Sequence, residues 1–237
     1  YFEARNMPDE AVALYEKGGN MSRALELCVQ LQRFDALARI TSTLTADSDP
    51  QLLQRCAKFF LENGQFDKTI HLYAVAGDPR RAVDLCAMHN IGVTEEMAEE
   101  LCPPQGQPGA ETAEARNDLL NKVAILAKRQ GSYHLACKLF TQVGEKIKGM
   151  KCLLKSGDTD KIIFFAGVSR TKEIYILAAN YLQTLDWRSD GEVMRNIVTF
   201  YTKAKAFEQL ANFFDACSQV EIDEYRDYEK AAGALRE

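Results

Sequence analysis

The chain has 237 residues, of which 46% are hydrophobic and 27% charged, and its formal net charge at pH 7 is −5. This length allows one large domain, two small ones or an array of repeats. The mildly acidic balance argues against general nucleic-acid binding, which needs basic surfaces that neutralise phosphates. The apolar runs, such as residues 162–166, are far shorter than the roughly 18 residues of a membrane-spanning helix.

The cysteines indicate the redox compartment of the protein, and the first residue indicates whether the chain is a fragment. The seven cysteines are an odd number and contain no C-x-x-C pair, and most fall where an amphipathic helix takes a small apolar side chain. We therefore expect reduced thiols packed in a core, as in a cytosolic protein, rather than disulfides or a metal site. Because the chain begins with Tyr1 and carries no signal peptide, it is predicted to be a fragment of a longer polypeptide.

From its N-terminus onward, the chain repeats a short word at steps of thirteen residues. The word is a turn residue, then small or apolar residues at the fifth and sixth positions after it, and an apolar residue at the eighth. In the copy that starts at Gly77 these are Ala82, Val83 and Leu85. The turn residues of the copies are Gly19, Gln32, Gly64, Gly77, Gly131, Gly144, Gly157, Arg170 and Lys205.

The thirteen-residue step has a physical explanation. The apolar spacing suits one buried stripe of a helix with 3.6 residues per turn. A glycine at the helix C-terminus accepts the left-handed conformation that closes the last turn, and Asp78, Ser132 or Asp158 directly after it supplies the next N-cap. Each step is therefore predicted to be one short helix of about ten residues, and two steps an antiparallel pair.

A longer helix is predicted between the first copies of the motif, and a segment without the motif follows them. Leu53, Cys56, Ala57 and Phe60 form one helical stripe. Residues 102–116 hold three of the six prolines and no large apolar side chain beyond Cys102, so we expect an exposed loop there. Because the word resumes after it, we predict a single solenoid domain over residues 1–237 with the 102–116 loop inserted.

The copies after the loop carry a run of lysines. Lys148, Lys151 and Lys155 share one helical face, with Lys146 and Lys161 nearby. Such a run is usually a solvated face. The functional alternative is a surface that docks an acidic partner or anionic lipid headgroups, with Lys146, Lys148, Lys151 and Lys155 as the candidate interaction residues.

Two further helices and an acidic segment complete the chain. One helical stripe is Ile174, Leu177, Ala178, Tyr181 and Leu185, and the next is Val193, Ile197, Phe200, Tyr201 and Ala204. Paired aromatics at 59–60, 164–165 and 213–214 are expected to place one ring within a helix pair and the other toward the next pair. Near the C-terminus, Tyr225 and Tyr228 stand among acidic residues and are predicted to pack on a following repeat rather than bind a ligand. About fifteen helices and no sheet are expected in total.

No arrangement of residues in the sequence indicates catalysis or a cofactor. The three histidines are scattered and lack ligand spacing, and His71 falls on a polar face. The segment Gly144–Gly149 resembles a phosphate-binding loop, but Met150 replaces its lysine and no strand precedes it. No nucleophile elbow occurs. We therefore expect no enzyme activity, no cofactor and no metal.

Two stretches carry a family resemblance. The words AVALYEKGGNMSRALELCVQL (11–31) and ILAKRQGSYHLACKLFTQVGEKIKGMKCLLKSGDTDKIIFFAG (125–167) resemble the C-terminal tetratricopeptide-like solenoids of intraflagellar transport proteins. The resemblance covers essentially the whole chain and is strongest to the family of the 140-kilodalton subunit of intraflagellar transport complex A. Two steps here make twenty-six residues, which is shorter than a standard tetratricopeptide repeat.

This resemblance implies an all-α solenoid of antiparallel helix pairs that acts as a non-enzymatic scaffold. It also implies retrograde ciliary transport, ciliary entry of membrane proteins, and a location at the cilium, the ciliary base and the cytoplasm. The implied partners are the other subunits of complex A and ciliary cargo adaptors, without nucleic acid or a membrane span. A coatomer- or clathrin-like coat module shares the solenoid and is the alternative. An RNA-reading helical repeat would need a basic groove, which the acidic balance disfavours.

Overall fold

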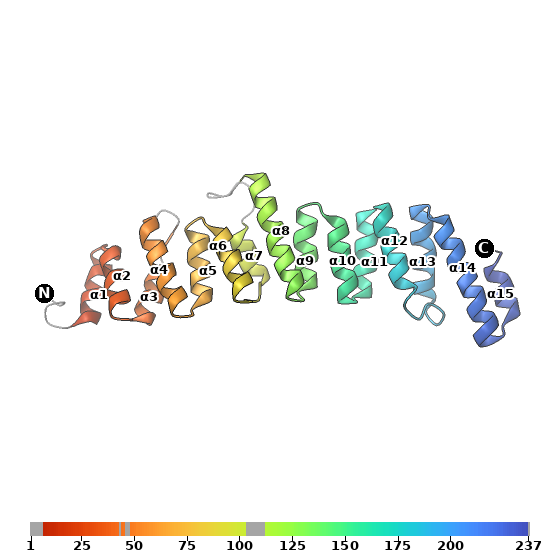
Figure 1. The fold of residues 1–237 in the computed structure, drawn as a ribbon, viewed down its shortest axis with the longest axis horizontal. Coiled ribbons are helices and arrows are strands. Elements are labelled where there is room, and N and C mark those ends of the chain that lie inside the picture. The colour runs from red at the N-terminus through yellow and green to blue at the C-terminus, as the bar shows by residue number, and fades with distance from the viewer. Residues whose placement is uncertain (1–6, 43, 46–47, 103–111, 237) are drawn as a thin grey trace. The chain divides into compact units, whose positions relative to one another are not determined.

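The computed structural model describes residues 7–42, 44–45, 48–102 and 112–236 (Figure 1). Over these residues it has fifteen α-helices, one π-helical turn and no strand, so the all-α prediction is confirmed. The helices form two compact units, residues 1–135 and 136–237. None of the helices in the described ranges combines the length and apolarity that a membrane span requires.

The first unit is a series of helices that pack on helices one or two places away in the chain. Contacts join α1 to α2, α2 to α3, α4 to α5 and α5 to α6, while α7 packs on α5 and α8 on α6. Its helices are α1 (Pro8–Lys17), α2 (Met21–Gln30), α3 (Phe34–Thr41), α4 (Pro50–Glu62), α5 (Phe66–Val75), α6 (Pro79–Met88), α7 (Glu95–Leu101) and α8 (Ala113–Arg129).

The second unit is built in the same way. The helix α12 packs on α10, α11 and α13, and α14 packs on α13, η2 and α15. Its elements are α9 (Tyr133–Gln142, whose first turn precedes the unit), α10 (Lys146–Ser156), α11 (Thr159–Ser169), α12 (Lys172–Leu182), α13 (Gly191–Ala204), α14 (Phe207–Val220), the π-helical turn η2 (Glu221–Tyr225) and α15 (Tyr228–Ala234).

The turn of every predicted copy adopts the left-handed conformation. The six glycines have φ between +71° and +88°, and Gln32, Arg170 and Lys205 have φ of 53°, 50° and 54°. At Gly64 the following residue, Gln65, donates its N–H to the carbonyl of Phe60 at 2.9 Å, which is the bond that closes a Schellman turn. The same conformation occurs at Asn90, thirteen residues after Gly77, where no turn was predicted.

The helix N-caps and the buried residues of the repeated motif agree with those predicted from the sequence. The carboxylates of Asp78 and Asp158 accept hydrogen bonds from the backbone N–H groups of Arg81 and Lys161 at 3.3 and 3.2 Å. The fifth residue after the turn is buried in the copies up to Gly157, because neighbouring helices pack against it. These residues include Ala24, Leu37, Thr69, Ala82, Ala136 and Ile162, each 0% exposed.

Side-chain hydrogen bonds connect elements through residues that are not part of the repeated motif. In the first unit, the Gln130 amide nitrogen donates to the Ile91 carbonyl, and its oxygen accepts from the Val93 N–H at 3.0 Å. In the second unit, the buried Tyr201 hydroxyl donates to Asn180 Oδ1 at 2.6 Å. These bonds tie the α6–α7 connection to the end of α8 and tie α12 to α13, because each satisfies a polar group that the fold buries.

The structure differs from the predicted 102–116 loop at both of its ends. Cys102 is buried, and residues 113–116 form the first turn of α8, with the Thr112 hydroxyl accepting a hydrogen bond from the Ala115 N–H. A helix start needs a cap and good helix formers rather than large apolar residues, which is why composition misplaced this boundary. Residues 103–111 lie outside the described residues. That all 237 residues form one domain stays a prediction, and the compact units divide at 135/136.

Two apolar assignments were wrong in detail. Phe164 is 72% exposed, so this ring of the 164–165 pair faces solvent rather than a neighbouring helix. In α12 the buried residues are Ile174, Tyr175, Ala178, Ala179 and Leu182, whereas Leu177, Tyr181 and Leu185 are only half-buried. The helix contacts α10, α11 and α13 together, so its buried surface is wider than one stripe and centred about one residue away.

Candidate protein-interaction surfaces

The predicted lysine surface lies on α10. Lys146, Lys148, Lys151 and Lys155 are all exposed, because the opposite side of the helix buries Met150, Cys152 and Leu153. Lys148, Lys151 and Lys155 are three and four residues apart and therefore share a face. The structure thus brings the predicted residues together on one exposed helix.

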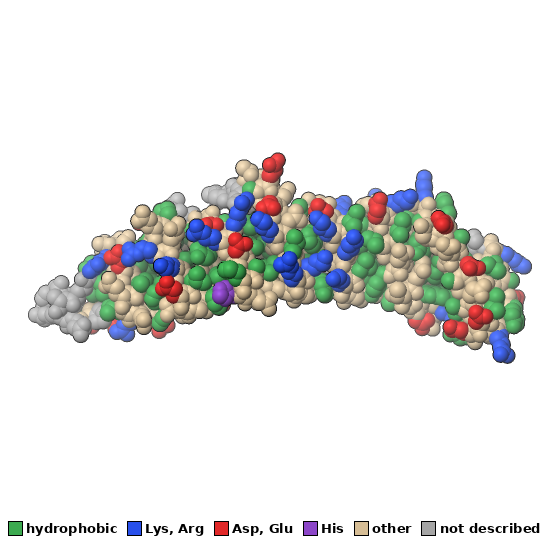
Figure 2. All heavy atoms as spheres, in the orientation of Figure 1, with side chains coloured by type: hydrophobic (Ala, Val, Ile, Leu, Met, Phe, Trp, Pro, Cys, Tyr) green, Lys and Arg blue, Asp and Glu red, His purple; other side chains and the backbone are tan. Residues whose placement is uncertain are grey.

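The charges of this surface are largely uncompensated. Lys148 forms an ion pair with Glu145 at 3.3 Å and lies 5.9 Å from the centre of the Phe140 ring. No ion pair to a described residue involves Lys146, Lys151 or Lys155. Residues 136–172 contain eight lysines and arginines against three acidic residues, and Figure 2 shows basic side chains gathered over this part of the second unit. The surface therefore suits an acidic partner.

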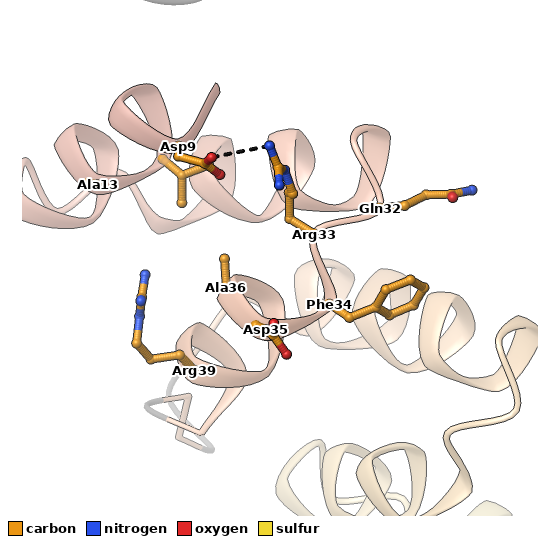
Figure 3. A pocket seen from close by; sticks show the side chains of 9 residues that line it. Asp9, Ala13, Gln32, Arg33, Phe34, Asp35, Ala36 and Arg39 are labelled. Atoms are coloured by element: carbon orange, nitrogen blue, oxygen red, sulfur yellow. Dashed lines mark hydrogen bonds and ion pairs between the residues drawn. The ribbon is translucent and has the colours of Figure 1, made fainter. Parts of the chain in front are cut away.

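A groove between α1 and α3 was not predicted. It encloses about 530 Å³ and is drawn in Figure 3, where Ala36 and Arg39 point from α3 toward α1. Arg33 donates to the Asp9 carboxylate at 3.1 Å, and Arg39 donates to Glu16 at 2.9 Å. Since carboxylates of α1 hold both arginines, the groove connects two helices of the unit rather than presenting charge to a ligand.

At the other end of the described chain, one tyrosine of the acidic segment is held by an arginine. Arg188, between α12 and α13, donates two hydrogen bonds to the Glu221 carboxylate at 3.0 and 3.2 Å. Its guanidinium lies 3.5 Å from the centre of the Tyr225 ring, which is a cation–π contact. Glu221 is 7% exposed, and its carboxylate raises the pKa of Arg188 above its usual value. Tyr228 is 66% exposed, so its predicted packing on a following repeat stays a prediction.

Comparison with protein families decides the relationship that these repeats suggest. The family model that describes the TPR domain of intraflagellar transport proteins 140 and 172 matches residues 1–200. A second model, which describes the C-terminal TPR domain of intraflagellar transport protein 140, matches residues 208–237. The chain belongs to the TPR domain family of intraflagellar transport proteins 140 and 172. This result confirms the resemblance drawn from residues 11–31 and 125–167, and it agrees with the stacked helix pairs of the structure.

The thiols of this intraflagellar transport TPR chain lie in its core. All seven cysteines are buried, as the helical pattern predicted, and each is a free thiol in this structure. Burial raises the pKa of Cys56 and of Cys217 to about 11, so these groups are protonated and poorly nucleophilic near neutral pH. Within the described ranges no group of three or more His, Cys, Asp or Glu residues is arranged to hold a metal ion.

The histidine that falls on a polar face has a structural partner in the TPR segment. His71 on α5 contacts the carboxylate of Glu100 on α7 through Nδ1, and this carboxylate raises the pKa of His71 above its usual value. Both side chains are partly exposed, and the pair links α5 to α7.

Sequence reasoning missed Arg188 and the apolar groove beside α14 that is described below. Arg188 and Glu221 are thirty-three residues apart, and neither belongs to a periodic word. The one local signal was the pair of exposed tyrosines in an acidic segment. No spacing rule connects Tyr225 to an arginine on the connection between α12 and α13.

Proposed function

We propose that the chain is a non-enzymatic protein–protein interaction scaffold within a subunit of intraflagellar transport complex A. In this proposal it acts in retrograde ciliary transport and in the ciliary entry of membrane proteins, at the cilium, the ciliary base and in the cytoplasm. The observation that carries the proposal is the match of residues 1–200 and 208–237 to intraflagellar transport TPR families. Stacked helix pairs of this type supply extended surfaces for partner proteins.

The partners in this proposal are the other subunits of complex A, together with ciliary cargo adaptors. The α10 surface, made of Lys146, Lys148, Lys151 and Lys155, is the proposed contact for an acidic region of one partner. Three of its four lysines have no ion pair in the described part of the chain, so a partner gains attraction without first breaking an internal pair.

Co-purification from ciliated cells tests the scaffold proposal. The full polypeptide that carries this segment is tagged and isolated, and its associated proteins are identified by mass spectrometry. The proposal expects complex A subunits in stoichiometric amounts. Recovery of vesicle-coat subunits in their place would support a coat module and overturn it.

Charge reversal tests the lysine surface. The triple change Lys148→Glu, Lys151→Glu and Lys155→Glu is expected to lower the recovery of one partner by about tenfold or more, the loss produced by removing roughly 1.4 kcal/mol of binding free energy. The matched control reverses three exposed cations on other helices, Arg80, Lys172 and Arg195. Equal loss in both triple variants would show that total charge, rather than this surface, governs binding.

A further inference from the structure

An apolar groove lies between α14 and α15. It encloses about 350 Å³, and Asp215 lies at its edge. Phe207 and Leu235 are each 62% exposed, which is unusual for side chains of this size. The apolar residues that line the groove are Phe207, Leu210, Ala211, Phe214, Ala234 and Leu235.

The groove is lined by motif positions that neighbouring helices cover in other parts of the fold. Leu210 and Ala211 are the fifth and sixth residues after the left-handed turn at Lys205. The equivalent residues after Gly77, Ala82 and Val83, are 0% and 5% exposed because neighbouring helices pack on α6. In contrast, Leu210 is half-buried and Ala211 exposed. The groove therefore has the form that a helix fills elsewhere in this fold.

The elements around the groove carry unpaired negative charge. Residues 207–237 contain eight acidic residues against three basic ones. Glu208, Asp215, Asp223, Glu224 and Glu229 make no ion pair with any described residue. Many carboxylates elsewhere, such as Asp9, Glu16 and Glu26, pair with arginines. Of these carboxylates, Asp215 lines the groove, and Glu208, seven residues earlier, lies on the same side of α14. An apolar groove with free carboxylates beside it is complementary to an apolar stripe flanked by cations.

We propose that this groove binds an amphipathic α-helix of a partner protein, whose apolar stripe enters the groove and whose flanks carry lysine or arginine. The proposal rests on the scaffold function proposed above and names the chemistry of one partner. Helix-in-groove recognition supplies the affinity through apolar anchors three and four residues apart, and the carboxylates supply orientation and a faster encounter.

A second copy of this chain fits the groove poorly. The most basic helix of the described residues is α10, and its apolar residues Met150, Cys152 and Leu153 are already buried in its own unit. Ile147, which is 40% exposed, and the half-buried Leu154 are its other large apolar residues, and these two side chains, seven residues apart, make no continuous apolar stripe for the groove of a neighbour. A basic helix of another protein meets both requirements together.

Site-specific crosslinking in the full polypeptide identifies what occupies the groove. A photoreactive benzoylphenylalanine replaces Phe207 in ciliated cells, and the crosslinked peptide is sequenced. The same replacement at Phe164, which is 72% exposed but lies outside the groove, is the control. The proposal expects a Phe207-specific crosslink to a partner segment with apolar residues at helical spacing and an excess of lysine and arginine. A crosslink to the same polypeptide or to a second copy would overturn it.

Binding of the identified segment, made as a synthetic peptide, tests the two features separately. Phe207→Asp and Leu235→Asp in the full polypeptide are each expected to weaken peptide binding by about tenfold or more, as loss of an anchor does. Glu208→Lys with Asp215→Lys should also weaken it and reduce its sensitivity to salt. Phe164→Asp should leave it unchanged. Thermal unfolding verifies that each variant is folded, and unchanged binding in both apolar variants would refute the groove. If complex A subunits still co-purify, the scaffold function stands without it.

Discussion

At the scale of single residues, the conformation at the turns sets the length of the repeats. All nine predicted turn residues have positive φ, and three of them are not glycine. A left-handed conformation costs an L-residue about 1–2 kcal/mol relative to the right-handed one, whereas glycine adopts it freely. Gln32, Arg170 and Lys205 therefore hold strained backbone that the packing of the flanking helices maintains.

Two glycine substitutions distinguish the effect of backbone conformation from the effect of the space available for a side chain. An added Cβ meets nothing within 4 Å at Gly64 or at Gly167, but only Gly64 has positive φ. We expect Gly64→Ala to lower the free energy of unfolding by about 1–2 kcal/mol, and Gly167→Ala, within α11, to raise it by about 0.5–1 kcal/mol. Denaturant unfolding measures both. Effects of the same sign would show that φ does not control these sites.

A second prediction concerns Ala82, the small residue at the fifth position of the repeated motif. Ala82 is 0% exposed between packed helices, so the extra volume in Ala82→Leu has no room. We expect a loss of about 1–3 kcal/mol in unfolding free energy. Ala216→Leu on the exposed side of α14 is the control and should change stability by less than about 0.5 kcal/mol. An unchanged midpoint for Ala82→Leu would contradict the packing of α6.

At the scale of elements, the helices are positioned by two kinds of contact. Consecutive helices pack through the word, which places Ala24 and Leu25 of α2 or Ala82 and Val83 of α6 in the core. Side-chain hydrogen bonds then fix segments outside the repeated motif. An example is the bond between Gln130, at the end of α8, and Val93 of the α6–α7 connection. The first kind repeats along the chain, whereas the second is particular to each place.

The link between α5 and α7 predicts a pH dependence. Because the carboxylate of Glu100 raises the pKa of His71 above its ordinary value of 6.5, the link contributes stability that is complete below pH 6.5 and is lost as the pH rises through the higher folded pKa. Glu100→Gln should therefore destabilise the protein more at pH 6 than at pH 9, measured by denaturant unfolding. Glu96→Gln, on the same helix, should show no such difference. A larger effect at pH 9 would contradict the assignment.

At the scale of the whole molecule, the chain is two compact units with different charge patterns. Residues 1–135 hold fourteen basic and nineteen acidic residues, whereas residues 136–237 hold fifteen of each. The neutral second unit is nevertheless polarised, since its basic excess lies at 136–172 and its acidic excess at 207–237. One unit therefore presents surfaces of opposite charge, which suits contacts with two different partners.

Stacked pairs also predict how damage spreads through the molecule. Each helix depends on its neighbours, so local stability should fall near a substitution and not far from it. We expect Ala82→Leu to reduce hydrogen-exchange protection in α5 and α8, the partners of α6, and to leave α13 and α14 unchanged. The reciprocal variant, Ala178→Leu in α12, should affect α10, α11 and α13 and spare α5. Uniform loss of protection along the chain in either variant would contradict nearest-neighbour coupling.

The sequence by itself determined the helices, the left-handed turns and the buried residues at the fifth position. These features are local, since φ preference, capping and the 3.6-residue period act within a few positions. The turn at Asn90 could have been found by the same step, but asparagine did not stand out as a turn residue. The lysine surface was also predictable, because Lys148, Lys151 and Lys155 share one helix face.

Only the tertiary structure decided which apolar side chains are covered. Phe164 and Phe213 look alike in the sequence, yet Phe164 is 72% exposed and Phe213 is 3% exposed. Arg188 finds Glu221 across thirty-three residues, and Phe207 and Leu235 line one groove although twenty-eight residues separate them. Burial depends on neighbours that are distant in the chain, so no window of sequence contains it. The candidate basic surface was therefore local information, whereas the apolar groove appeared only once α14 and α15 were placed together.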